Sequence, residues 1–196
     1  MSNVVSEKKE LRRSAKRARA AAHAQHKAGA GRLLATHGLG FAGLADAAKV
    51  SGYISIRDEI DPGPLMQALA TSGHPLALPV IEAPDQALFL AQWAPGDDMD
   101  EGAMGIPEPS RDAESVSVDV DCMLVPLLAV DRRGYRLGYG GGFYDRTIAG
   151  LKAKKPVMTI GLAFDEQIVE AVPHDDYDQR LNWILTPSGP IKCQDD

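Results

Sequence analysis

The sequence has 196 residues, of which 44% are hydrophobic and 24% charged, proportions typical of one globular domain large enough to build a core. Its net charge of −6 argues against a general nucleic-acid-binding protein. No apolar run approaches the roughly 20 residues that a membrane-spanning helix needs, so no membrane association is expected.

The N-terminal residues are polar and basic, without the apolar segment of a secretory signal, and Glu7 and Glu10 argue against a mitochondrial transit peptide. The two cysteines, Cys122 and Cys193, are then expected to be reduced thiols without a catalytic role. We therefore expect a cytoplasmic protein, and of the possible oligomeric states a monomer.

Residues 1–30 are predicted to form a basic N-terminal helix with Ser6 as N-cap, continuing towards residue 35 with a break near residues 29–31. One face of it carries Lys8, Arg12, Lys16 and Arg19. Most charge runs of this kind are solvated faces. Because cations near a helix N-terminus are disfavoured, the alternative is an anionic ligand held against Lys8 and Arg12.

The next segments alternate between strand and helix. A strand is expected over residues 48–55, followed by a helix that begins near residues 62–64 with Asp61 as its cap. Glu59, between the two, has no evident capping role, and carboxylates just after a strand are well placed for binding. We therefore treat Glu59 as a functional candidate and Asp61 as structural.

The rest of the chain completes an α/β pattern. Further strands are expected over residues 75–80, 87–93, 122–126, 156–164 and 181–186. Residues 94–114 are too rich in Gly, Pro and acidic residues for a core element and predict a lid or a disordered loop, and residues 187–196 predict a loose tail. The pattern favours one domain with a mostly parallel sheet covered by helices on both faces.

The most informative stretch runs from residue 125 to residue 146. Four glycines, Gly138, Gly140, Gly141 and Gly142, lie within five residues, Arg132, Arg133 and Arg136 add positive charge, and helical spacing follows from Phe143. A strand, a Gly-rich loop and a helix N-terminus together form a typical phosphate site. Phe143 stands where the Walker A and dinucleotide motifs require glycine, so neither fits, and a Gly-rich hairpin loop remains the alternative.

This stretch also follows the pattern Pro-x-x-x-x-Asp-x-x-Gly-x-Arg-Leu-Gly-x-Gly-x-Gly-aromatic-Tyr-Asp from Pro126 to Asp145. With it occur, in order, Lys8-x-x-x-Arg12, the turn Asp58-Glu59-Ile60, the run at 105–109, Ala163-Phe164 before Gln167, and Val172-Pro173 before Asp178. In these motifs the chain resembles the 5-formyltetrahydrofolate cyclo-ligase family, also called methenyltetrahydrofolate synthetases.

The resemblance implies a three-layer αβα fold like that of ribose-5-phosphate isomerase and the CoA-transferases. It implies that ATP and 5-formyltetrahydrofolate are converted, with Mg²⁺, to 5,10-methenyltetrahydrofolate, ADP and phosphate. Some relatives have Lys at the position of Gly141, and many have Asp at the position of Asn182. A non-catalytic nucleotide- or folate-binding relative is therefore the main alternative, and a phosphotransferase acting on another amide is a third.

Residue roles follow from the same resemblance. The catalytic candidates are Arg136 and Tyr144, and the expected magnesium ligands are Asp145 and Asp178. The expected ATP contacts are Lys8, Lys9, Arg12, Arg136, Leu137, Gly138, Tyr139, Gly140, Gly141, Gly142, Phe143 and Tyr144. The expected folate contacts are Ile54, Glu59, Tyr139, Gly140, Gly141, Gly142 and Phe143.

Overall fold

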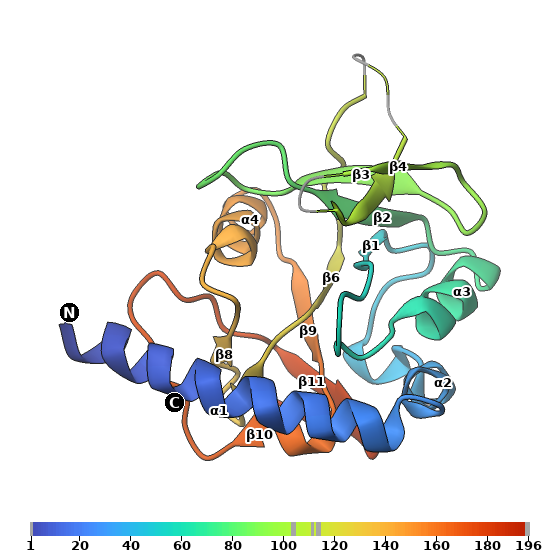
Figure 1. The fold of residues 1–196 in the computed structure, drawn as a ribbon. Helices are drawn as coiled ribbons and strands as arrows, with labels where there is room; N and C mark the ends of the chain where they lie inside the picture. The colour runs from blue at the N-terminus through green and yellow to red at the C-terminus, as the bar shows by residue number, and fades with distance from the viewer. Residues whose placement is uncertain (1, 103–104, 111, 113–114, 195–196) are drawn as a thin grey trace.

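The computed structural model describes residues 2–102, 105–110, 112 and 115–194 (Figure 1). A seven-stranded sheet has the order β12-β11-β9-β6-β1-β2-β3. The strands span Gly189–Lys192, Trp183–Thr186, Met158–Leu162, Cys122–Val125, Val50–Ser51, Leu76–Val80 and Phe89–Trp93, in that order. The five inner strands are parallel to one another and both edge strands are antiparallel, which confirms the mostly parallel sheet.

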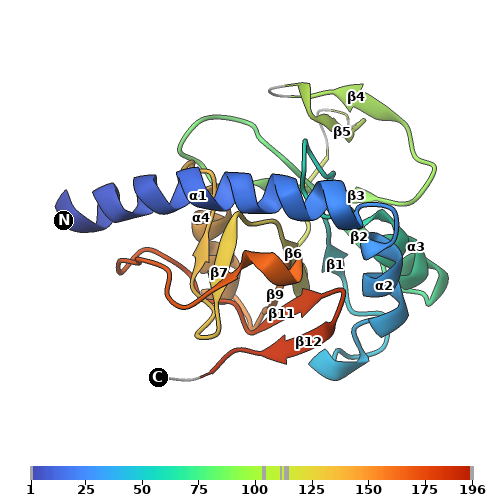
Figure 2. The same ribbon diagram turned by 60° about the horizontal axis from the view of Figure 1, so that its bottom comes forward.

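Helices cover both faces of this sheet. Helix α4 (Phe143–Lys152) lies on one face, and α2 (Ala30–His37) and α3 (Gly63–Thr71) lie on the other (Figures 1 and 2). Along β6 the side chains alternate, so that Cys122 and Leu124 join the core under α2 and α3, while Met123 and Val125 join the core under α4. A strand buried on both faces needs apolar residues at consecutive positions, which explains its unbroken apolar run.

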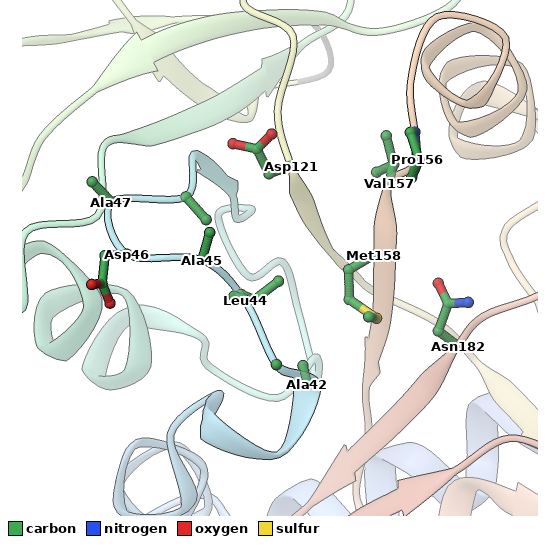
Figure 3. A pocket seen from close by; sticks show the side chains of 12 residues that line it. Ala42, Leu44, Ala45, Asp46, Ala47, Asp121, Pro156, Val157, Met158 and Asn182 are labelled. Atoms are coloured by element: carbon green, nitrogen blue, oxygen red, sulfur yellow. The ribbon is translucent and has the colours of Figure 1, made fainter.

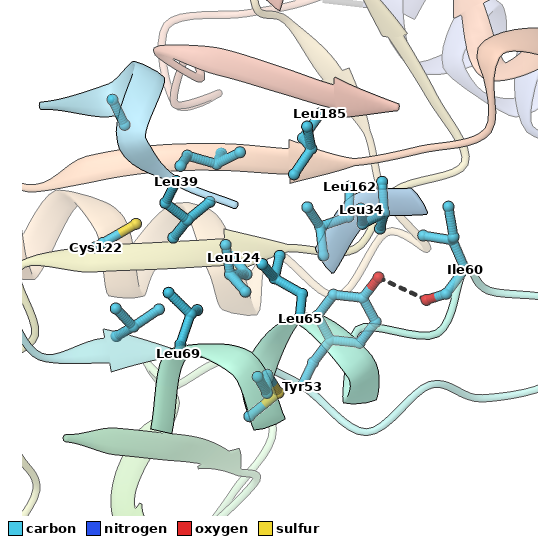
Figure 4. Close-up of a cluster of buried hydrophobic side chains, with 14 of the residues drawn as sticks. Leu34, Leu39, Tyr53, Ile60, Leu65, Leu69, Cys122, Leu124, Leu162 and Leu185 are labelled. Carbon is cyan, nitrogen blue, oxygen red and sulfur yellow. Dashed lines mark hydrogen bonds between the residues drawn. The ribbon is translucent and has the colours of Figure 1, made fainter. Parts of the chain in front are cut away.

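The core under α2 and α3 is an apolar cluster closed by one polar contact (Figure 4). Leu34 of α2 and Leu65 of α3 pack with Leu124 and Leu162 of the sheet. The buried hydroxyl of Tyr53 donates to the carbonyl of Ile60 at 2.9 Å, so this core also fixes the segment that follows β1.

Helix α1 (Ser2–His26) crosses the end of the sheet instead of covering a face (Figure 2). It packs through Ala15 against Leu128, Ala129 and Leu137, part of a small sheet of order β10-β7-β8. These strands span Ile168–Val169, Ala129–Asp131 and Arg136–Leu137, and short 3-10 turns lie at Gly40–Ala42 (η1) and Asp165–Gln167 (η3). The expected break before α2 is confirmed, but Ser6 is not the N-cap, because the helix already includes Ser2.

Several predicted boundaries were wrong. Of the strand expected over residues 48–55, only Val50–Ser51 forms a strand of the sheet. Residues 187–194 are not a loose tail, since β12 pairs with β11 along its length, and residues 195–196 lie outside the described part of the chain. Within residues 94–114, β4 (Met99–Glu101) and β5 (Pro107–Pro109) form a separate antiparallel pair. Residues 103–104, 111 and 113–114 of that segment lie outside the described part of the chain.

The predicted contact of Asp61 at the start of α3 and the two free thiols are confirmed. The carboxylate of Asp61 accepts the amide of Gly63 at 2.9 Å at the start of α3. Cys122 and Cys193 are buried free thiols, and burial raises the pKa of Cys122 to about 12 and that of Cys193 to about 11. Among the described helices, none combines the length and the apolar character that crossing a membrane requires.

The turn between β7 and β8 supplies a stability prediction. Gly134 has φ +89°, and an added Cβ would lie 2.4 Å from the carbonyl oxygen of Leu181. Gly134→Ala should therefore destabilise the fold by about 1–3 kcal/mol. Gly150→Ala, in α4 with nothing within 4 Å of the new methyl, should stabilise it by about 0.5–1 kcal/mol. Urea unfolding compares the two, and equal stability of Gly134→Ala and wild type would contradict the strain argument.

Candidate functional site

The candidate residues gather at the carboxyl ends of the parallel strands. The segment after β1 holds Asp58 and Glu59, the segment after β6 leads through the β7–β8 hairpin into the glycine loop 138–142, and α1 lies across both. Ligand sites of open α/β sheets lie at this edge. The fold thus brings together segments that are up to 170 residues apart in the sequence.

The glycine loop lies between Arg12 and the N-terminus of α4. Nε of Arg12 donates to the carbonyl of Gly138 at 3.0 Å, and a side chain at Gly140 would lie 3.4 Å from its guanidinium. Gly140 and Gly142 have φ values of +107° and +67°, and Gly142 caps α4. The predicted sequence of Gly-rich loop and helix N-terminus is confirmed, and Arg12 is beside it.

Lys8 joins α1 to the acidic loop. Its Nζ lies 2.8 Å from Asp175 and 2.5 Å from Asp178, and 13% of its side chain is exposed. Burial lowers the pKa of Lys8, but the hydrogen bonds and charges of Asp175 and Asp178 outweigh it, so that the pKa is raised overall. Lys9 and Lys16 are exposed, so only part of the predicted basic face is buried against the rest of the protein.

Arg136 and Asp145 form an ion pair behind the loop. Nη2 of Arg136 lies 2.8 Å from Oδ1 of Asp145, and its Nη1 donates to the carbonyl of Gln179 at 2.6 Å. The same carboxylate oxygen accepts the amide of Gln179 at 2.9 Å. Asp145 therefore sits beside the residue that follows Asp178, so the structure brings the two predicted magnesium ligands to neighbouring positions. Among the described residues, no three His, Cys, Asp or Glu side chains gather into a metal-binding group.

On the other side of the loop, Glu59 and Tyr139 meet Arg19. Glu59 is 5% exposed, its Oε2 accepts the amide of Ile56 at 3.0 Å, and Arg19 lies 3.5 Å from Oε1. Glu59 therefore does serve the local turn, contrary to our prediction. Burial raises the pKa of Glu59, against the opposing effects of the Ile56 amide and Arg19.

Ile54, Phe143 and Tyr144 are half-buried and pack against the core clusters. Burial and the nearby charge of Glu59 raise the pKa of Tyr144 far above its ordinary value. Its phenol is therefore neutral at physiological pH, so it is available as a hydrogen-bond donor and not as a base.

Arg146 of α4 contacts the glycine loop, and sequence reasoning missed it. Its Nη2 donates to the carbonyl of Gly141 at 2.6 Å, its Nε donates to the carbonyl of Gln86 at 3.1 Å, and it covers the ring of Phe143. Arg132 and Arg133, which were expected to charge this loop, lie instead at the β7–β8 turn, where Arg133 pairs with Asp131 at 2.8 Å. The sequence did offer one signal for Arg146, because this residue lies three positions after Phe143 and therefore on the same face of the predicted helix.

Asn182 lies away from the expected metal ligands. Its Oδ1 accepts the backbone amide of Thr159 at 2.8 Å, just before β11 begins. Together with Asp121, Met158 and the segment 42–48 it lines a hollow of about 480 Å³ (Figure 3). This hollow lies at the amino ends of β6 and β9, at the opposite edge of the sheet from the glycine loop.

Comparison with known proteins finds relatives that match most of the chain. A family model described as the 5-formyltetrahydrofolate cyclo-ligase family matches residues 4–187. The 5-formyltetrahydrofolate cyclo-ligase of Escherichia coli is 33% identical over 162 residues, which cover 81% of this chain and 88% of that protein. The one of Haemophilus influenzae is also 33% identical, over 76% of this chain and 81% of that protein.

Solved structures show the same likeness. The 5,10-methenyltetrahydrofolate synthetase of Aquifex aeolicus is 28% identical, with a TM-score of 0.76, covering 96% of this chain and 94% of that one. The synthetase of Mycoplasma pneumoniae, at 21% identity, shares the fold with a TM-score of 0.68, covering 92% of this chain and 99% of that one.

The link between Lys8 and the acidic loop predicts a pH dependence. The hydrogen bond from Lys8 lowers the pKa of Asp175, so this contribution to stability is present above the unfolded pKa of about 3.9 and is lost as the pH falls through the lower folded value. Lys8→Met should therefore cost on the order of 0.5–1 kcal/mol at pH 7, and this cost should shrink as the pH falls below about 3.9.

Urea unfolding of wild type and Lys8→Met across this pH range measures the difference. Lys9→Met, which removes an exposed neighbour of the same charge, should show no pH-dependent difference from wild type. A cost for Lys8→Met that stayed constant down to pH 3 would contradict the assigned ion pair.

Proposed function

The chain belongs to the 5-formyltetrahydrofolate cyclo-ligase family, and we propose that ATP and 5-formyltetrahydrofolate meet at the carboxyl edge of its sheet. The reaction forms 5,10-methenyltetrahydrofolate, ADP and phosphate. The observation that carries this placement is the hydrogen bond from Arg12 to Gly138, because it brings the basic helix onto the glycine loop. Guanidinium, backbone amides and a helix N-terminus then converge, and each of them favours a phosphate group.

The chemistry requires positioning more than reactive side chains. The formyl oxygen is a poor leaving group, so it first attacks the γ-phosphorus of ATP and ADP departs. N10 of the folate then attacks the activated formyl carbon, the ring closes, phosphate leaves, and N10 gives up its proton. Both steps depend on holding two substrates in line and on stabilising phosphoryl charge.

The ATP side is formed by α1 and the glycine loop. In our proposal Lys8, Lys9 and Arg12 face the phosphates from the helix, and the backbone from Leu137 to Tyr144 surrounds them. Arg136 acts from behind the loop, since its side chain is 5% exposed and its terminal nitrogens hold Asp145 and Gln179. Its contribution is to orient Asp145 and to place positive charge under the phosphates.

Asp145 and Asp178 suit Mg²⁺. Each binds its basic partner through one carboxylate oxygen, Oδ1 of Asp145 and Oδ2 of Asp178, which leaves the other oxygen of each for a cation. Two carboxylate oxygens completed by water and substrate phosphates are a common set of magnesium ligands. When bound, such an ion neutralises the charge that develops on the transferred phosphoryl group.

The folate side lies across the loop from the ATP side. Ile54, Glu59 and residues 139–143 would contact the folate there, and the neutral phenol of Tyr144 would donate to the oxygen that becomes phosphorylated. The grouping with ribose-5-phosphate isomerase and the CoA-transferases, the cytoplasmic location and the monomeric state stay predictions.

An absorbance assay of methenyltetrahydrofolate formation tests the activity. Product should appear only when both 5-formyltetrahydrofolate and MgATP are present, with one ADP per product. Arg12→Ala should lower kcat/KM for ATP by 10-fold or more, because a charge-assisted contact contributes about 1.5–3 kcal/mol.

Arg13→Ala is the matched control, since Arg13 is exposed beside Arg12 and pairs with Glu10 at 3.1 Å. Absence of product with the wild-type protein would contradict the function, and binding of both ligands without ADP release would favour the non-catalytic alternative. Wild-type ATP kinetics in Arg12→Ala would contradict only the placement of ATP.

Magnesium dependence tests the two carboxylates. Chelation should abolish activity and added Mg²⁺ should restore it. Asp145→Asn and Asp178→Asn should each raise the Mg²⁺ concentration for half-maximal activity by about 10-fold or more, since loss of a group that only orients a metal ligand already costs about 10–100-fold in metal affinity. Asp176→Asn, on the exposed part of the same loop, should leave it unchanged. Unaltered Mg²⁺ dependence in both site variants would remove this assignment.

A further inference from the structure

Arg19 is a fully buried arginine at the carboxyl edge, with 1% of its surface exposed. Its Nη2 donates to Oδ1 of Asp58 at 2.8 Å and to the hydroxyl of Tyr139, and its Nη1 donates to the carbonyl of Leu127 at 3.2 Å. Oε1 of Glu59 lies 3.5 Å from Nη1. Arg19 thus joins α1 to three other segments. These are the segment after β1, the short connection between β6 and β7, and the glycine loop.

The environment of Arg19 is not that of a residue selected for stability alone. Burying a guanidinium carries a desolvation cost that ion pairs only partly offset, and apolar replacements of buried ion pairs are often as stable. Nε of Arg19 is buried without a hydrogen-bond partner among the described residues, which adds to that cost. The arrangement therefore calls for a reason other than packing.

Tyr139 supplies that reason. It stands between Gly138 and Gly140 in a loop whose backbone does little to fix its own conformation, and 39% of its surface is exposed. The guanidinium of Arg19 lies 5.3 Å from the centre of the Tyr139 ring and also binds its hydroxyl. Arg19 therefore holds both the ring and the hydroxyl of an aromatic side chain at the surface of the site.

The two carboxylates near Arg19 respond differently. Burial raises the pKa of Asp58, but the hydrogen bond and charge of Arg19 outweigh it and leave the pKa below its ordinary value. The pKa of Glu59 stays raised, since burial dominates there. Arg19 thus pairs mainly with Asp58. Glu59 lies next to Arg19, whose positive charge offsets only part of the cost of burying the Glu59 carboxylate.

We propose that Arg19 is a positioning residue that fixes Glu59 and Tyr139 relative to each other on the folate side of the site. This inference rests on the proposed function and deepens it. Arg12 and Arg19 are seven residues apart on α1, about 10 Å along the helix axis. Arg12 contacts the loop from the ATP side and Arg19 contacts it from the folate side, so loss of Arg19 affects the folate far more than ATP.

Three variants test this assignment. Arg19→Met keeps the length and removes the charge, Arg19→Lys keeps the charge but not the two-pronged geometry, and Tyr139→Phe removes only the hydroxyl that Arg19 holds. Arg17→Met, on the exposed face of the same helix, is the control. Circular dichroism and thermal unfolding report whether each variant is folded, and steady-state kinetics give KM and kcat for each substrate separately.

Arg19→Met should raise KM for 5-formyltetrahydrofolate by about 10-fold or more, the equivalent of one lost charge-assisted contact, with KM for ATP within about twofold of wild type. Arg19→Lys should recover part of the loss. Because Tyr139→Phe loses the same hydroxyl contact, combining it with Arg19→Lys should cost less than the two single effects added together. A merely structural role would instead lower the concentration of active enzyme and leave both KM values unchanged.

Tyr139→Phe keeps the test decisive if Arg19→Met does not fold, because the changed atom is on a partly exposed loop residue. Wild-type folate KM in both Tyr139→Phe and Arg19→Lys would overturn the proposal, and so would equal increases in the KM values for ATP and folate. Calorimetry of the wild-type protein with 5-formyltetrahydrofolate distinguishes failure of the proposed function from failure of the role assigned to Arg19. If the wild-type protein neither binds folate nor forms product, the proposed function fails, and if it does both, only the role of Arg19 is at stake.

Discussion

The docking of α1 across the carboxyl ends of the parallel strands is the contact on which the rest of the site depends. It combines a small apolar seam at Ala15 with polar contacts made by Lys8, Arg12 and Arg19. Each of these three side chains reaches a different segment: the acidic loop, the glycine loop and the end of the segment after β6. Because one helix contacts all three segments, α1 helps to set their relative positions.

The glycine loop explains why so much external support is needed. Glycines at positive φ let backbone groups surround an anion, but they also give the loop little stiffness of its own. Arginines therefore hold it from several directions: Arg12 at Gly138, Arg146 at Gly141 and Arg19 at Tyr139. A site that must align two substrates gains from groups held by rigid elements, here two helices, α1 and α4.

The sequence was sufficient to predict the α/β class, the parallel sheet and the strand, loop and helix around residues 138–142, because periodicity and glycine spacing are local signals. It was not sufficient for β12, whose residues gain order only by pairing with β11. It also missed Arg19 and Arg146, since one basic residue among many shows its role only when the fold buries it or directs it to a carbonyl. Asn182 shows the opposite error, in which nearness in sequence suggests a shared site. It is only four residues from Asp178, but its side chain binds Thr159 of β9.

Burial also changes how the basic helix is understood. From the sequence, Lys8, Arg12, Lys16 and Arg19 form one uniform charged face. In the fold, Lys16 is solvated, Lys8 neutralises two carboxylates, Arg12 is half-buried over the loop, and Arg19 is enclosed. Because an α-helix is stiff, Arg12 and Arg19 lie a fixed distance apart and hold the two sides of the glycine loop at that separation. In the proposed arrangement, α1 therefore sets the spacing between the two substrates.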